Sequence, residues 1–304
     1  MTQTFARKNR NKIKLTQEDK VVNAVVYTIA VFIVIVCFYP FYLSIVLAFN
    51  EGKDAVFGGI YFWPRKFTLE NFTLLIEDSA WGRALAVTAA RTVLGTTLTT
   101  FFTSFVAYGL SDRQLVGRKT YMTLIVFAMY FSGGVIPYYA LLRSLGLLNN
   151  FLVYIIPGML SLFYVLVSIS FFEGIPRELG ESARIDGASE MRIFFRIILP
   201  IATPLLATIA IFTAVGHWNS WYDSAFFVQR KELRTMGYQL MSIINKSTAT
   251  MGANLQPEAI AAATSTTMSV QLAAMLVAVA PILTVYPFFQ RYFVSGLTIG
   301  SVKG

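Results

Sequence analysis

The side chains able to perform chemistry are few in this sequence. It has one cysteine, Cys37, inside an apolar run, and one histidine, His217, so it can form neither an internal disulfide nor a histidine-rich metal site. It contains no His-Glu-x-x-His pattern and no Gly-x-x-x-x-Gly-Lys-Ser/Thr phosphate-binding loop. We therefore expect no catalytic residue, and no metal or cofactor bound by this chain.

The most informative segment is polar and lies between two long apolar runs, at residues 176–204. Ionised side chains are costly in hydrocarbon, so this segment must lie outside the bilayer. Gly187 is placed to end a short helix in the left-handed conformation, and Ser189 is placed to cap the next one. Ala183 and Gly187 are four residues apart and would share a helix face. The sequence predicts a flat patch there, against which another protein can pack.

The composition indicates a membrane protein. The chain of 304 residues is 56% hydrophobic and 13% charged, with a mean hydropathy of +0.60, whereas soluble domains carry about 25% charged residues. Its net charge of +9 comes from basic residues that cluster beside apolar runs. This distribution favours a signal for membrane orientation over nucleic-acid binding.

Six apolar runs each exceed the roughly 18 residues that indicate a membrane-spanning helix. They cover residues 21–48, 84–110, 121–142, 151–172, 197–222 and 268–290. The third is interrupted by Gly133 and Gly134. The sequence therefore predicts an all-α polytopic membrane protein with six transmembrane helices.

The basic residues predict the orientation, because cytoplasmic loops are enriched in Lys and Arg. Residues 1–20 hold six basic side chains against two acids, residues 113–119 hold three more, and residues 176–196 hold four arginines. We expect these segments and both termini to be cytoplasmic. Loops 51–83 and 223–267 are then expected on the outer side.

A spaced motif lies within the polar segment. Glu181, Ala183 and Gly187 are followed after nine residues by Ile-x-Leu-Pro at 197–200. This motif resembles the EAA loop of ABC importer permeases, the element that docks a cytoplasmic ATPase. Ser182 stands where the family pattern has Ala, which is a small perturbation.

Other segments are similar to the carbohydrate-uptake class of these permeases, of the MalG-like and LplC/YtcP type. They are Asp186-Gly187-Ala188, Phe131-Ser132-Gly133-Gly134 and the carboxyl-terminal residues 296–304. The resemblance implies a type I ABC importer (MetI-like) permease fold over residues 21–304. A basic cytoplasmic segment, 1–20, would precede it, and the EAA coupling loop would be residues 176–200.

The resemblance also implies partners and docking residues. The implied ATPase-docking residues are Glu181, Ser182, Ala183, Asp186, Gly187 and Ala188. The implied partners are a second homologous permease, two cytoplasmic ABC ATPase subunits that bind ATP and Mg²⁺, and an extracytoplasmic solute-binding protein. The chain would be a non-enzymatic permease subunit for sugars, with oligosaccharides favoured, either neutral or acidic. It would lie in a bacterial cytoplasmic membrane.

Aromatic and polar side chains alternate at the outer end of the fifth run, where residues 217–223 read His-Trp-Asn-Ser-Trp-Tyr-Asp. Apolar and aromatic walls with a few placed polar groups are typical of small-molecule sites, and Asn219 is the leading candidate for a sugar contact. The candidates for the solute path are Trp218, Asn219, Trp221, Tyr222 and Tyr138, with Tyr130 and Tyr139 as weaker ones. The alternative is an interfacial aromatic belt, because Trp and Tyr favour the headgroup level.

Arg91 is the one strong charge within the predicted spans. An ionisable residue inside the membrane is by default a functional hypothesis. Because Arg91 lies near the outer end of its run, snorkelling to the interface is an equal alternative. If it faced the path, an acidic sugar would be favoured.

Two other classes of protein compete with the permease interpretation. A secondary transporter relays charge through acids in the membrane, and none of the six runs contains an acid. An intramembrane enzyme needs a nucleophile with a base, or a metal cluster. With one histidine and one cysteine, this chain does not fit that class.

Overall fold

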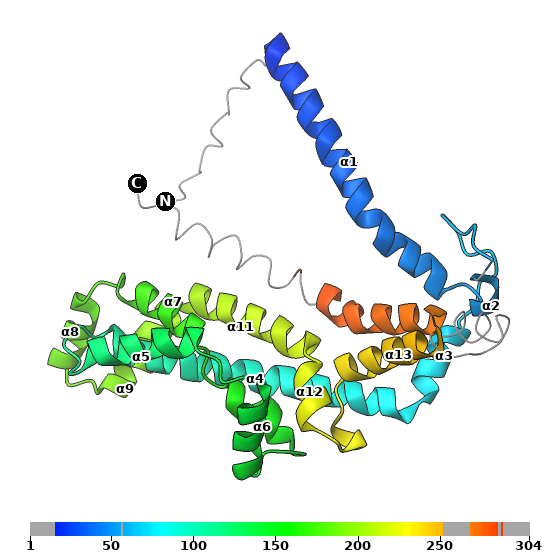
Figure 1. The fold of residues 1–304 in the computed structure, drawn as a ribbon. Helices are drawn as coiled ribbons and strands as arrows, with labels where there is room; N and C mark the ends of the chain where they lie inside the picture. The colour runs from blue at the N-terminus through cyan, green and yellow to red at the C-terminus, as the bar shows by residue number, and fades with distance from the viewer. Residues whose placement is uncertain (1–15, 56, 252–267, 285–286, 288–304) are drawn as a thin grey trace, which may run out of the picture.

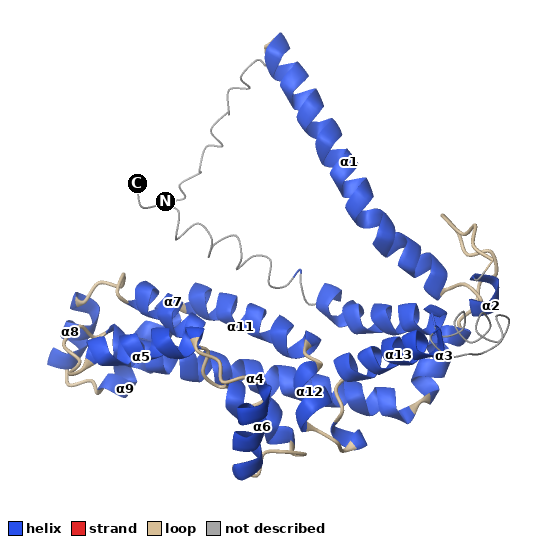
Figure 2. Ribbon diagram, in the orientation of Figure 1, coloured by secondary structure: helices blue, strands red, loops and turns tan. Residues whose placement is uncertain are grey.

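The computed structural model describes residues 16–55, 57–251, 268–284 and 287. Within these residues the regular elements are helices, and the one bridge between extended residues joins Asn50 to Phe67. Figures 1 and 2 show an elongated bundle with one long helix standing apart from it. Residues 1–15 and 296–304, which carry part of the basic segment and the carboxyl-terminal motif, lie outside the described residues.

The helix that stands apart is α1, Gln17–Ala48. A capping box starts it: Oγ1 of Thr16 accepts from the Asp19 amide at 3.2 Å, and the Asp19 carboxylate accepts from the Thr16 amide at 2.9 Å. Its apolar side chains are exposed along nearly its whole length, and Val46 and Ala48 alone are buried in it. An apolar helix with so little cover within its own chain must be covered by lipid or by another subunit.

The bundle is organised around α4, Ser79–Ser111, which packs against α7, Leu162–Phe172, and α11, Thr203–Asn219. Its buried face repeats at three- and four-residue intervals and consists mainly of small side chains. That face comprises Trp81, Ala84, Thr88, Arg91, Gly95, Thr99, Thr103, Ala107 and Leu110. Small residues allow helix backbones to approach closely in membranes. At Gly95 the approach is so close that an added Cβ would lie 2.5 Å from Nε2 of His217.

The third predicted span is not one continuous helix. It consists of α5, Arg118–Tyr130, and α6, Val135–Ser144, and the two helices meet at 116°. Gly134 adopts φ +81° at the junction, a conformation that costs little for glycine alone. The Gly133-Gly134 pair therefore both interrupts the span and changes the direction of the chain.

The fourth and fifth predicted spans are also bent. The fourth comprises η1, Phe151–Tyr154, and η2, Ile156–Gly158, followed by α7 at 41°. The fifth follows α9, Glu190–Ile193; it begins within the π-helical turn η3, Phe194–Ile198, continues through α10, Leu199–Ile201, and then turns by 79° into α11. The apolar run 197–222 is therefore not one continuous helix: the bend falls between Pro200 and Pro204, each of which lacks a backbone donor, and α11 ends at Asn219.

The connection predicted over residues 223–267 is largely helical where it is described, and its place on the outer side stays a prediction. It contains α12, Tyr222–Phe227, the turn η4, Lys231–Leu233, and α13, Met236–Met251. Three further helices are short: α2, Gly52–Ala55, α3, Glu70–Glu77, and α8, Glu178–Ile185. Residues 252–267 of the predicted loop lie outside the described residues.

The described residues contain two continuous helices long and apolar enough to cross a membrane, α1 and α4, and up to five spans if each bent pair counts as one. The helix Met268–Thr284 is apolar but shorter, and the predicted sixth span continues beyond it to residue 290. The number of six spans therefore stays a prediction.

Candidate functional site

The polar segment forms α8 and a sharp turn into α9. Gly187 ends the turn with φ +78°, its amide donates to the Arg184 carbonyl at 3.0 Å, and the Ala188 amide donates to the Ala183 carbonyl at 2.9 Å. Oγ of Ser189 then accepts from the Arg192 amide at 3.4 Å. The expected left-handed helix end at Gly187 and the expected N-cap at Ser189 are both confirmed.

The expectation that Ala183 and Gly187 share one flat helix face was wrong. The helix ends at Ile185, and Gly187 lies beyond it. Ala183 is half-buried and packs on the apolar core, as does Ala188, whereas Gly187 is exposed. The exposed surface is made instead by Glu181, Ser182, Ile185, Asp186 and Gly187.

Ile185 is 87% exposed at the end of α8. The side chain is therefore outside the apolar core and open to a partner. Sequence reasoning missed Ile185, although its place within the motif, between Ala183 and Gly187, was the available signal.

The turn is fastened to α4 through Glu190. The Arg184 guanidinium on α8 forms an ion pair with Glu190, and Oη of Tyr108 on α4 donates to Oε2 of Glu190 at 3.1 Å. The hydrogen bond from Arg184 holds the pKa of the Glu190 carboxyl below its usual value, so the carboxylate is ionised at neutral pH. Sequence reasoning did not select Tyr108 or Glu190, because the contact spans 82 positions of the chain.

Three of the five residues expected on the solute path line one cavity. Trp218, Asn219 and Trp221 face it, together with Met236 and Leu240 of α13. The cavity holds about 200 Å³. Nε1 of Trp218 donates to the Ala278 carbonyl at 2.9 Å, so the half-buried indole is paired within the chain. For Trp218 this geometry favours a site wall over an interfacial belt.

The other two expected path residues lie elsewhere. Rings of Tyr138 and Tyr222 approach that of Phe227, with centroids 5.4 Å and 6.0 Å from it. Phe227 is buried in an apolar cluster formed by α6, η1 and α12. Neither tyrosine lines the cavity of Trp218 and Asn219. The weaker candidates Tyr130 and Tyr139 are exposed and do not line it either.

Arg91 is buried, with 3% of its surface exposed. One guanidinium nitrogen forms an ion pair with Asp223, and Nε donates to Nδ1 of His217 at 3.3 Å. The guanidinium carbon also lies 4.7 Å from the ring centroid of Tyr154. Snorkelling to the interface was therefore the wrong interpretation, and the side chain is not open to a solute path.

Asp223 was missed because it follows the predicted end of the fifth span by one residue. The available signal was Arg91 itself, since a lone charge within a membrane protein requires a partner. Oγ of Ser220 also donates to Oδ2 of Asp223 at 3.3 Å. The cluster thereby connects α4 to the break between α11 and α12, next to the cavity residues Asn219 and Trp221.

Comparison with proteins of known sequence identifies relatives over nearly the whole chain. No family model matches it. It is 37% identical over 267 residues to protein LplC of Bacillus subtilis strain 168, an alignment covering 87% of this chain and 89% of LplC. It is 33% identical over 287 residues to the polygalacturonan/rhamnogalacturonan transport system permease protein YtcP of the same strain, covering 94% of this chain and all of YtcP.

Solved structures show the same fold. One chain of a bacterial ABC transporter involved in the import of the acidic polysaccharide alginate superimposes with a TM-score of 0.80 and 25% identity, covering 91% of this chain and 98% of that one. The fold is thus that of a helical permease of an ABC importer. The sequence identities to LplC and YtcP define the family more narrowly than the fold does. The chain belongs to the family of sugar ABC transporter permeases.

Replacing Asp223 with Asn should destabilise the protein. Asp223→Asn leaves Arg91 buried without its counter-ion. Breaking a buried ion pair lowers the free energy of unfolding by about 3–5 kcal/mol. We expect a smaller loss here, because the Asp223 side chain is partly exposed. We expect a lower midpoint of thermal unfolding for the detergent-purified protein.

Glu232→Gln is the matched control, because Glu232 is exposed on η4 and its replacement removes the same charge. Equal midpoints for Asp223→Asn and Glu232→Gln would contradict the role given to the Arg91–Asp223 pair.

Proposed function

We propose that the chain forms one half of the translocation path of a binding-protein-dependent ABC importer for oligosaccharides. The observation that carries the proposal is family membership over nearly the whole length, with 33% identity to YtcP across all of that permease. A second homologous permease would complete the path, and the exposed apolar surface of α1 is available to such a partner. A solute-binding protein would deliver the sugar at the outer side.

The substrate we propose is an acidic oligosaccharide. YtcP is named for polygalacturonan and rhamnogalacturonan, whose uronic acids carry carboxylates, and the structural neighbour imports acidic alginate. In this chain Arg91 is committed to Asp223 and cannot meet a sugar carboxylate. The cavity of Trp218, Asn219 and Trp221 offers stacking surfaces and an amide, so it would recognise the sugar ring and hydroxyl groups.

The ATPase would dock on the exposed surface of α8 and its turn, at Glu181, Ser182, Ile185, Asp186 and Gly187. Support comes from the exposure of Ile185 and from the Tyr108–Glu190 contact, which gives a docked subunit a mechanical connection to α4. ATP and Mg²⁺ would be bound by the two ATPase subunits. This end of the chain, with both termini, would be cytoplasmic, in agreement with its excess of Lys and Arg.

A bulky side chain on the docking surface should uncouple the ATPase. Gly187 is a poor position for the test, because φ +78° strains any other L-residue there. Ser182 is exposed in the middle of α8. We expect Ser182→Trp to abolish co-purification of the ATPase and sugar uptake while the permease is still inserted in the membrane.

The matched control is Val116→Trp, since Val116 is 90% exposed in the loop that follows α4. Normal ATPase co-purification with Ser182→Trp would exclude this surface as the docking site.

Removing the amide from the cavity should weaken sugar uptake. Asn219→Ala deletes one hydrogen-bonding group, and a net loss of about 1.4 kcal/mol corresponds to about a tenfold rise in the sugar concentration needed for half-maximal uptake. Uptake of an oligogalacturonide by cells or proteoliposomes measures the effect, with complex assembly checked by co-purification.

Gln229→Ala serves as the control, because Gln229 carries an exposed amide outside the cavity. If both variants transported the oligosaccharide like the unmodified protein, Asn219 would not contact the solute.

A further inference from the structure

The segment between α2 and α3 carries a group of large aromatic side chains that are exposed on the protein surface. In residues 57–64, Phe57 is 84% exposed, Tyr61 60%, Phe62 72% and Trp63 79%. The segment contains no charged residue, although the residues that flank it are rich in charge. Four exposed rings in eight residues form an apolar patch that requires a partner.

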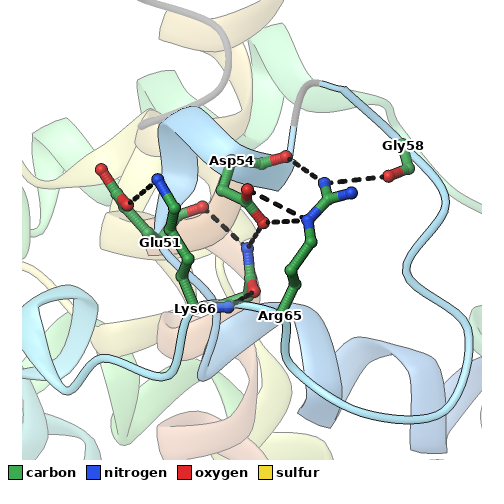
Figure 3. Close-up of polar contacts among 6 residues, drawn as sticks. Glu51, Asp54, Gly58, Arg65 and Lys66 are labelled. Carbon is green, nitrogen blue, oxygen red and sulfur yellow. Dashed lines mark hydrogen bonds and ion pairs between the residues drawn. The ribbon is translucent and has the colours of Figure 1, made fainter.

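The base of the segment is clamped by ion pairs, as Figure 3 shows. Nε of Arg65 donates to both carboxylate oxygens of Asp54, at 2.9 Å and 3.1 Å, and Nη2 of Arg65 donates to the Gly58 carbonyl at 3.1 Å. Nζ of Lys66 lies 3.3 Å from the Glu51 carboxylate. The clamp holds the two ends of the segment together, so the segment forms a closed loop whose base is charged and whose tip is aromatic.

The tip lies against the outer part of α1. The Tyr42 hydroxyl donates to the Phe62 carbonyl, and the Tyr39 and Phe62 rings are 6.4 Å apart. Tyr42 and Tyr39 precede the helix end at Ala48 by six and nine residues, which is about 9 Å and about 14 Å along the helix. The loop therefore folds back beside the apolar helix instead of projecting away from it.

We propose that residues 57–64 form an aromatic wedge that inserts into the membrane at the level of the lipid headgroups. Three observations support lipid as the occupant: the tip is aromatic and uncharged, the charges are confined to its base, and its rings lie beside the exposed apolar side chains of α1. Trp and Tyr prefer this depth because their rings are apolar and their polar atoms can reach water. The wedge anchors the outer end of α1 through Tyr42. The inference depends on the chain being a membrane protein and not on its substrate.

A spin label placed on the loop measures its surroundings directly. In a Cys37→Ser background, Trp63→Cys and Tyr61→Cys are labelled separately with a nitroxide in the assembled complex, reconstituted into lipid bilayers. Collision with oxygen, which concentrates in lipid, is compared with collision with a nickel chelate confined to water. Glu77→Cys is the matched outer-side control, because Glu77 is exposed at the end of α3.

We expect high oxygen and low nickel collision at positions 61 and 63, and high nickel collision at position 77. High nickel collision at positions 61 and 63 would place the loop in water and overturn the proposal. Low collision with both reagents would mean that the solute-binding protein or another subunit covers the loop, which would overturn it equally. Using two positions keeps the test decisive if one variant fails to assemble.

Discussion

The ion pair between Arg91 and Asp223 is the contact on which the geometry around the cavity depends. A guanidinium with 3% exposure cannot be left unpaired, because the penalty for burying its charge exceeds what surrounding packing can offset. Asp223 lies in the first turn of α12, just past the break at Ser220 that follows α11. That break sets the directions of Asn219 and Trp221, which line the cavity.

The other end of α4 carries the second important contact. Tyr108 lies 17 residues after Arg91, about 25 Å along the same helix. Its hydrogen bond to Glu190 joins α4 to the turn that follows α8. One rigid helix thus contacts the proposed docking surface at one end and the polar cluster beside the cavity at the other. In the proposed importer, closure of the ATPases would move the docking turn, and α4 and α11 would carry the motion outward, since they pack along their shared length through small residues.

Local features of the site could be read from the sequence, and contacts between distant segments could not. Gly187 and Ser189 were predictable because helix ends depend on the residues that form them. The bends at 116° and 79° were only hinted at by Gly134, Pro200 and Pro204, since periodicity gives the length of an apolar run but not its direction. Asp223 was assigned to a loop because the end of an apolar run is set by hydropathy alone, which carries no information about the buried Arg91 that Asp223 pairs with. Helix α13 was missed because polar residues interrupt its apolar ones.

The central claim is that this permease couples an external sugar-loaded binding protein to ATP hydrolysis by separate subunits. The most direct test is the rate of ATP hydrolysis by the complete complex in proteoliposomes, measured with no binding protein, with sugar-free binding protein and with binding protein loaded with an acidic oligosaccharide. The account predicts the highest rate with the loaded binding protein. A rate indifferent to binding protein and sugar, in a complex shown to be intact, would contradict it.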